Sequence, residues 1–107
     1  MDATTAVSAL AALAQDTRLL VFRMLVERGP EGLPAGQIAV RAGVPPSSLT
    51  FHLQQLVHAG LVTQRRSGRH LFYAADHAAM NALVAYLTEN CCGLGAATAP
   101  VCDAVGT

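Results

Sequence analysis

The stretch that most constrains how this chain folds is residues 45–73, where a helical pattern is followed at once by a strand pattern. In its first half, leucines recur at a spacing of three and four residues. They are Leu49, Leu53 and Leu56. At about 100° per residue these side chains fall within roughly 60° of one another, so they form one narrow apolar face of a helix. Gly60 ends that pattern. The first half therefore predicts a helix that buries one face and leaves the other free.

The second half of the stretch predicts a β-hairpin. Residues 61–66 and 70–75 are both rich in strand-forming side chains. The tight turn between them is Ser67, Gly68 and Arg69. Gly68 can take the positive φ that such a turn requires. A helix followed directly by an arginine-flanked hairpin is a layout in which the helix is presented to DNA and the hairpin lies beside it as a wing.

Helical spacing of apolar residues predicts four more helices. They are expected at residues 5–15, 17–28, 34–42 and 77–90. Thr4 or Thr5, Asp16 and Asp76 can cap three of them, and Gly43 can end the short third one. With the leucine-striped helix this gives five helices and a two-stranded wing. The fold class is therefore mainly α (α+β), a winged helix-turn-helix.

The first and last helices each carry a helical stripe of apolar side chains. The stripes are Val7, Leu10, Ala11 and Ala14 in the first, and Met80, Leu83, Val84 and Leu87 in the last. The 107-residue chain is 52% hydrophobic, but much of that content is alanine, which buries little area per residue. A small alanine-rich core is marginal alone, so we expect a homodimer.

One domain, residues 1–92, accounts for these elements. Residues 93–107 are rich in Gly, Ala and Thr and are expected to form a flexible C-terminal tail that carries the third thiol. No run reaches 18 uninterrupted apolar residues, and the start of the chain has Asp2 and no basic segment, so we expect neither a membrane span nor a signal peptide. A cytoplasmic location, with reduced thiols, is the expectation.

Charge is unevenly distributed along a chain whose formal net charge is zero. Residues 32–75 contain no Asp or Glu, while Arg41, Arg65, Arg66 and Arg69 all lie within them. A neutral protein can therefore present a basic middle to nucleic acid. The three wing arginines would be solvated at a hairpin tip or would hold backbone phosphates or a minor-groove edge. Because no acid is near them in the sequence, we favour contact with DNA.

The face of the helix opposite the leucines offers groups that can read base edges in a major groove. The expected reading residues are Ser47, Ser48, Thr50, Phe51, Gln54 and Gln55. Phe51 lies roughly 160° from Leu49, so it should contact a base or another protein unless it packs under a loop. His52 lies beside the leucine face, and we expect it to pack or to bond a phosphate at the DNA interface.

The three cysteines, Cys91, Cys92 and Cys102, all lie near the C-terminus. Adjacent cysteines point about 100° apart on a helix, so they converge only where the backbone leaves the helix. Three thiolates suit a thiophilic three-coordinate ion, As(III) or Sb(III), better than zinc, which takes four ligands. A zinc site would need His77 or a residue of a partner chain. The alternatives are small apolar filler, or a redox-sensing disulfide such as Cys91 with Cys102.

These residues resemble the ArsR/SmtB winged-helix metalloregulators over residues 6–92. The motifs that carry the resemblance are Ala14-Gln15-Asp16-Thr17-Arg18-Leu19, Leu49-Thr50-Phe51-His52-Leu53-Gln54-Gln55-Leu56, Ala59-Gly60-Leu61-Val62 and Arg65-Arg66-Ser67-Gly68-Arg69. The ending Thr88-Glu89-Asn90-Cys91-Cys92 is similar to that of arsenic-responsive repressors. Residues 34–48 lack the cysteine cluster of some arsenic sensors, and the last helix lacks the histidine pattern of the zinc sensors.

The resemblance implies a homodimer that pairs its first and last helices, binds an operator with two half-sites and releases it when an effector binds. We therefore expect an arsenic(III)-responsive repressor that derepresses a resistance operon, with As(III), or Sb(III), as inducer and no organic cofactor. Another thiophilic metal and thiol oxidation are the alternative signals, and a protein-interaction module is the alternative use of the fold. An enzyme is not expected, because no nucleophile, base and oxyanion site come together in the pattern.

Overall fold

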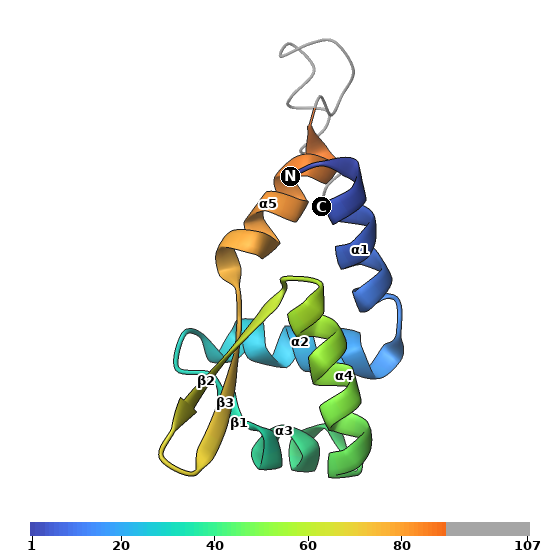
Figure 1. Ribbon diagram of the computed structural model, residues 1–107. Helices are drawn as coiled ribbons and strands as arrows, with labels where there is room; N and C mark the ends of the chain where they lie inside the picture. Colours follow the sequence, from blue (N-terminus) through green and yellow to red (C-terminus); the bar gives the residue numbers. More distant parts are fainter. Residues whose placement is uncertain (90–107) are drawn as a thin grey trace.

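The computed structural model describes residues 1–89 and shows five helices and a three-stranded antiparallel sheet (Figure 1). The elements are α1 (Ala3–Leu13), α2 (Asp16–Arg28), β1 (Leu33–Pro34), α3 (Ala35–Ala42), α4 (Pro46–His58), β2 (Val62–Ser67), β3 (His70–Ala75) and α5 (His77–Thr88). The winged helix-turn-helix fold expected from the sequence is confirmed. The three cysteines and the expected tail lie outside the described residues. None of the helices within residues 1–89 is both long and apolar enough to cross a membrane.

The wing contains one strand more than expected. Strands β2 and β3 pair as the predicted hairpin, and β1 adds to the other edge of β3, in the order β1-β3-β2. In the added pair Leu33 lies opposite Tyr73 and Pro34 opposite Phe72. Gly32 makes this close approach possible: its φ is 71°, and a Cβ there would collide with the Tyr73 carbonyl. The expectation of a two-stranded sheet is corrected to three.

Two of the expected helix caps are replaced by the preceding polar residue. Because α1 starts at Ala3, its N-cap is Asp2, whose carboxylate accepts from the Thr5 amide at 2.7 Å. This bond holds the pKa of Asp2 below its usual value. Gln15 caps α2 by accepting from the Arg18 amide at 2.9 Å, so Asp16 lies inside the first turn. Asp76 caps α5 as expected.

The core lies where α4 packs against α2, α3 and the base of the wing. Each leucine of the α4 stripe is buried there, together with large side chains from α2, from α3 and from the residue just before β2. They are Leu49, Leu53, Leu56, Val21, Leu25, Ile38 and Leu61. In α3 the inward residues are Ile38 and Ala39, while Val40 points to solvent. The narrow apolar face read from the sequence is therefore the face that anchors α4.

The apolar stripe of α1 does not face this core. Small residues are buried instead, at Ala6, Ala9 and Ala12. Val7 is 64% exposed, and Leu10 is exposed as well. Helices α1 and α5 contact each other and stand together at the end of the molecule away from the wing turn (Figure 1). Alanine allows α1 to approach its neighbours closely and leaves its larger side chains outside.

Candidate DNA-binding surface

The N-terminal end of α4, helix α3 and the turn of the wing all lie at one end of the molecule, opposite α1 and α5 (Figure 1). All three come from the acid-free span of the chain, residues 32–75. The fold therefore gathers the basic part of a neutral chain on one end, next to the free face of α4. This arrangement supplies the positive potential that attracts a phosphate backbone.

The first two turns of α4 present the groups that the sequence selects for base reading. Ser47, Ser48, Thr50 and Phe51 are all exposed. The Phe51 side chain is 59% exposed, so no loop among residues 1–89 covers it. The Thr50 hydroxyl donates to the Pro46 carbonyl at 3.0 Å, which leaves its oxygen to accept and its methyl group for apolar contact. These two turns offer polar groups and one aromatic ring at the same end of one helix.

The start of α4 suits a phosphate. Pro45 precedes the helix and Pro46 occupies its first turn, and no side chain caps it. The first amides of a helix have no intrahelical partner, and the helix dipole places partial positive charge there. The amides of Ser47 and Ser48 can therefore donate to a DNA phosphate, which would fix how deeply α4 enters the groove.

Two of the expected reading residues, Gln54 and Gln55, and the neighbouring His52 lie further along α4 than the first two turns. His52 and Gln54 are half-buried, while Gln55 is exposed. Nδ1 of His52 lies 3.4 Å from Nη1 of Arg18 in α2. The His52 ring also contacts the Phe51 ring edge-on. Gln55 lines a hollow between α1 and the second half of α4. The reading surface thus centres on the first two turns of α4.

The wing arginines also divide into two kinds. Successive strand residues point to opposite faces, so Arg65 shares a face with Phe72 and Arg66 shares the other with Tyr73. Arg65 donates to the Glu31 carbonyl at 2.8 Å and stacks on Phe72. Arg66 and Arg69, at the turn, are exposed. Arg65, which is exposed as well, thus has partners in the protein, and contact of Arg66 and Arg69 with a phosphate stays a prediction.

Sequence reasoning did not select a hollow of about 460 Å³ between α3 and the wing. Its polar lining is Gln37, Arg41 and His70, and Val40 stands beside them with its side chain 82% exposed. The one sequence feature that pointed toward this hollow was Arg41, which lies within the acid-free span, residues 32–75. The hollow lies at the end of the molecule that carries the α4 surface, because α3 and the wing turn stand at that end (Figure 1).

A metal centre is not formed by the part of the chain that the structure describes: residues 1–89 bring no three His, Cys, Asp or Glu side chains together. His77 lies at the start of α5, where its Nε2 is 3.4 Å from the Val26 carbonyl. The helix that follows separates it from Thr88 by about 17 Å at 1.5 Å per residue.

Comparison with known proteins identifies the architecture. A family model described as a helix-turn-helix domain matches residues 13–65, which run from the end of α1 through α4 into β2. The HTH-type transcriptional regulator YgaV of Escherichia coli is 30% identical over 91 residues, 85% of this chain and 90% of that protein. A solved ArsR-like transcriptional regulator from Rhodococcus has a TM-score of 0.68 at 29% identity, covering 78% of this chain and 76% of that one.

The chain belongs to the ArsR-type family of winged-helix transcriptional regulators. A second similar structure, from Mycobacterium bovis, is described as a homodimeric winged helix-turn-helix DNA-binding domain and a possible ArsR-family regulator. It has a TM-score of 0.65 at 27% identity and covers 81% of each chain. As an ArsR-type regulator, the protein has in α4 the second helix of a helix-turn-helix, whose first helix is α3. DNA binding by a transcriptional regulator is the activity that this family carries.

Proposed function

We propose that the protein is a dimeric repressor that reads an operator with α4 and releases it when As(III) binds its C-terminal thiols. The single observation that carries the DNA-reading part is the exposed Phe51 on a polar helix face, at the basic end of the molecule. A ring that is 59% exposed adds little to the core, and at this place it can contact thymine methyl groups in a major groove.

The proposed dimer uses α1 and α5. Val84 and Leu87 are 53% and 55% exposed on α5, and Val7 and Leu10 are exposed on the neighbouring α1. Exposed apolar side chains gathered on adjacent helices are typical of an interface with another chain. The homodimeric description of the Mycobacterium bovis relative supports the same assembly. Two copies paired there would each direct the wing end of the molecule away from the contact, toward one half-site each.

The proposed inducer site begins where the dimer helix ends. Helix α5 stops at Thr88, before Cys91 and Cys92, so the pair need not hold the 100° separation of adjacent helical residues. Thiolates are the soft ligands that thiophilic ions prefer, and three of them, with Cys102, match a three-coordinate metalloid. Binding there would reorder the end of α5 and shift the spacing of the two readout helices. Reduced cytoplasmic thiols are the state that this chemistry needs.

The test starts with a pool of random duplex DNA from which the purified full-length protein selects its operator. Fluorescence anisotropy then measures binding to that operator, with arsenite, antimonite and hydrogen peroxide in separate arms. Release by arsenite or antimonite, with recovery after a competing dithiol removes the metalloid, supports the proposal. Release by peroxide alone would replace it with a thiol-oxidation switch. Failure to select any DNA would contradict the reading function itself.

A further inference from the structure

Arg18 lies where three helices meet. It belongs to the first turn of α2, and its Nε donates to the Ala12 carbonyl near the end of α1 at 2.7 Å. Its Nη1 lies 3.4 Å from Nδ1 of His52 in α4. The side chain is half-buried, and neither of its two partners is a carboxylate. One guanidinium therefore connects the proposed dimer helix, α1, to the proposed readout helix, α4.

Arg18 and His52 form a hydrogen bond in only one tautomer of the imidazole. Arginine carries only donors, so Nδ1 of His52 accepts when the ring proton is on Nε2. At 3.4 Å the bond is longer than the usual range of about 2.7–3.2 Å, so it is weak and easily exchanged.

The link through Arg18 matters for the position of α4 because a hollow lies beside it. About 320 Å³ of space lies between α1 and the second half of α4, with Ser8, Gln55 and His58 along its walls. Tightly packed helices resist rotation because interdigitated side chains block it. Helices α1 and α4 contact each other beside this hollow, and the hollow itself adds no interdigitated side chains that would oppose a shift of α4 relative to α1. The Arg18 bonds are the polar connection across that gap.

We propose that Arg18 is a positioning residue: through His52 it sets the orientation of α4 relative to α1, and so the spacing at which a dimer reads its two half-sites. This inference rests on the proposed function, in which α4 reads DNA and α1 pairs the subunits. Its consequence concerns discrimination between operators, because a rotated readout helix still carries the same charges and the same reading groups. Overall attraction to DNA should change less than the preference for the correct spacing.

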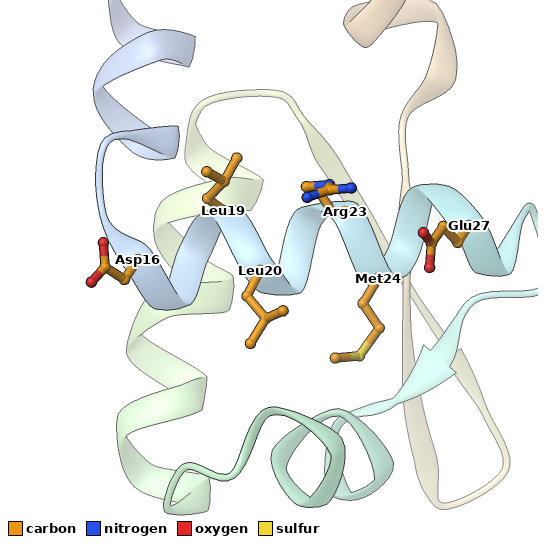
Figure 2. Close-up of a pocket in the computed structure, with 6 residues that line it drawn as sticks. All are labelled: Asp16, Leu19, Leu20, Arg23, Met24 and Glu27. Carbon is orange, nitrogen blue, oxygen red and sulfur yellow. The ribbon is translucent and has the colours of Figure 1, made fainter.

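The test compares full-length variants on the selected operator and on operators with one base pair added or removed between the half-sites. Arg18→Gln and His52→Leu each remove the link. His52→Gln keeps an acceptor that Arg18 can reach. Arg23→Gln is the matched control, because Arg23 lies on the outer face of the same helix, beside Leu19 and Glu27 (Figure 2). Equilibrium unfolding of every variant is measured alongside.

We expect Arg18→Gln and His52→Leu each to lower the spacing preference by roughly five- to tenfold, the scale of one weak hydrogen bond. The double variant should lose no more than either single one, and His52→Gln and Arg23→Gln should retain the preference. If Arg18→Gln is too unstable to assay, the comparison of His52→Leu with His52→Gln tests the inference by itself. Neither of these two changes removes the hydrogen bond from Arg18 to the Ala12 carbonyl. The inference would be overturned if the double variant lost the sum of the spacing preference lost by the two single variants. It would also be overturned if both His52 variants kept the spacing preference of the wild type. A wild-type protein with no spacing preference would instead count against the proposed function.

Discussion

The guanidinium of Arg65 lies over the ring of Phe72, 4.8 Å from its centre, and donates at the same time to the Glu31 carbonyl. The sequence places Arg65 beside Arg66, as one of three equivalent wing arginines. The structure separates them, because alternate residues of a strand point to opposite faces. Arg65 ties the wing to the loop before β1, while Arg66 and Arg69 stay exposed.

The wing arginines should therefore differ in salt dependence. Arg66→Gln and Arg69→Gln should each weaken operator binding and lower the slope of log affinity against log salt by about one, as expected for one lost phosphate contact. Arg65→Gln should change that slope less and reduce the free energy of unfolding by about 0.5–1 kcal/mol, through the lost stacking. Anisotropy at several salt concentrations and urea unfolding measure the two effects. Equal slopes for all three variants would show that the wing arginines act alike.

Phe51 should matter for recognition and not for folding. Phe51→Ala is expected to weaken specific operator binding by about 1–3 kcal/mol, roughly 5- to 150-fold, because a base-edge contact is lost. Its thermal midpoint should stay near that of the wild type, since the ring is exposed. Leu20→Ala is the control: Leu20 is also an exposed apolar residue, but it belongs to α2, and its side chain points toward α3 in Figure 2. A loss of stability in Phe51→Ala with unchanged affinity would make the ring structural.

The apolar surface of α1 and α5 should hold two subunits together. Val84→Asp places a carboxylate in that surface, and a buried unpaired charge is strongly unfavourable. We expect the dimer dissociation constant to rise by at least about tenfold, and operator affinity to fall with it. Sedimentation equilibrium gives the dissociation constant, and Leu20→Asp tests whether any surface carboxylate has the same effect. A Val84→Asp protein that dimerises like the wild type would place the interface elsewhere.

Two glycines with similar backbone angles should respond differently to the same change. Gly32 and Gly60 have φ of 71° and 79°, but a Cβ at Gly60 would meet nothing within 4 Å, while one at Gly32 would strike the Tyr73 carbonyl. Gly60→Ala should cost about 1–2 kcal/mol, from the left-handed backbone alone. Gly32→Ala should cost a further 1–3 kcal/mol or so, from the steric overlap. Urea unfolding distinguishes them, and equal costs would mean that β1 does not sit tightly against β3.

The sequence predicted the elements that local rules control. The leucine spacing identified the buried face of α4, the polar cap at Asp76 located the start of α5, and the range of β3 was predicted without error. Strand β1 could not be found in this way. It has two residues, one of them a proline, and it exists because it pairs with β3 nearly forty positions further along the chain.

The sequence predicted which residues belong to the candidate site, but it did not predict where each of their side chains points. A helical wheel placed Gln54 and Gln55 with Phe51, yet the way α4 packs leaves Gln54 half-buried and turns Gln55 toward α1. The partner of His52 is Arg18, 34 residues away, and no local pattern connects them. On α1 the large apolar residues suggested a buried stripe, but the alanines are buried there because a small side chain lets two helices approach closely.

The measurement that tests the central claim most directly is the operator dissociation constant of the full-length dimer at fixed salt, with and without arsenite. Wild type should bind roughly 5- to 150-fold more weakly with arsenite, the usual range of allosteric coupling. The variants Cys91→Ser, Cys92→Ser and Cys102→Ser should each bind the operator normally and lose most of that response. An arsenite response that survives in all three variants, or a wild-type protein that does not respond, would contradict the account.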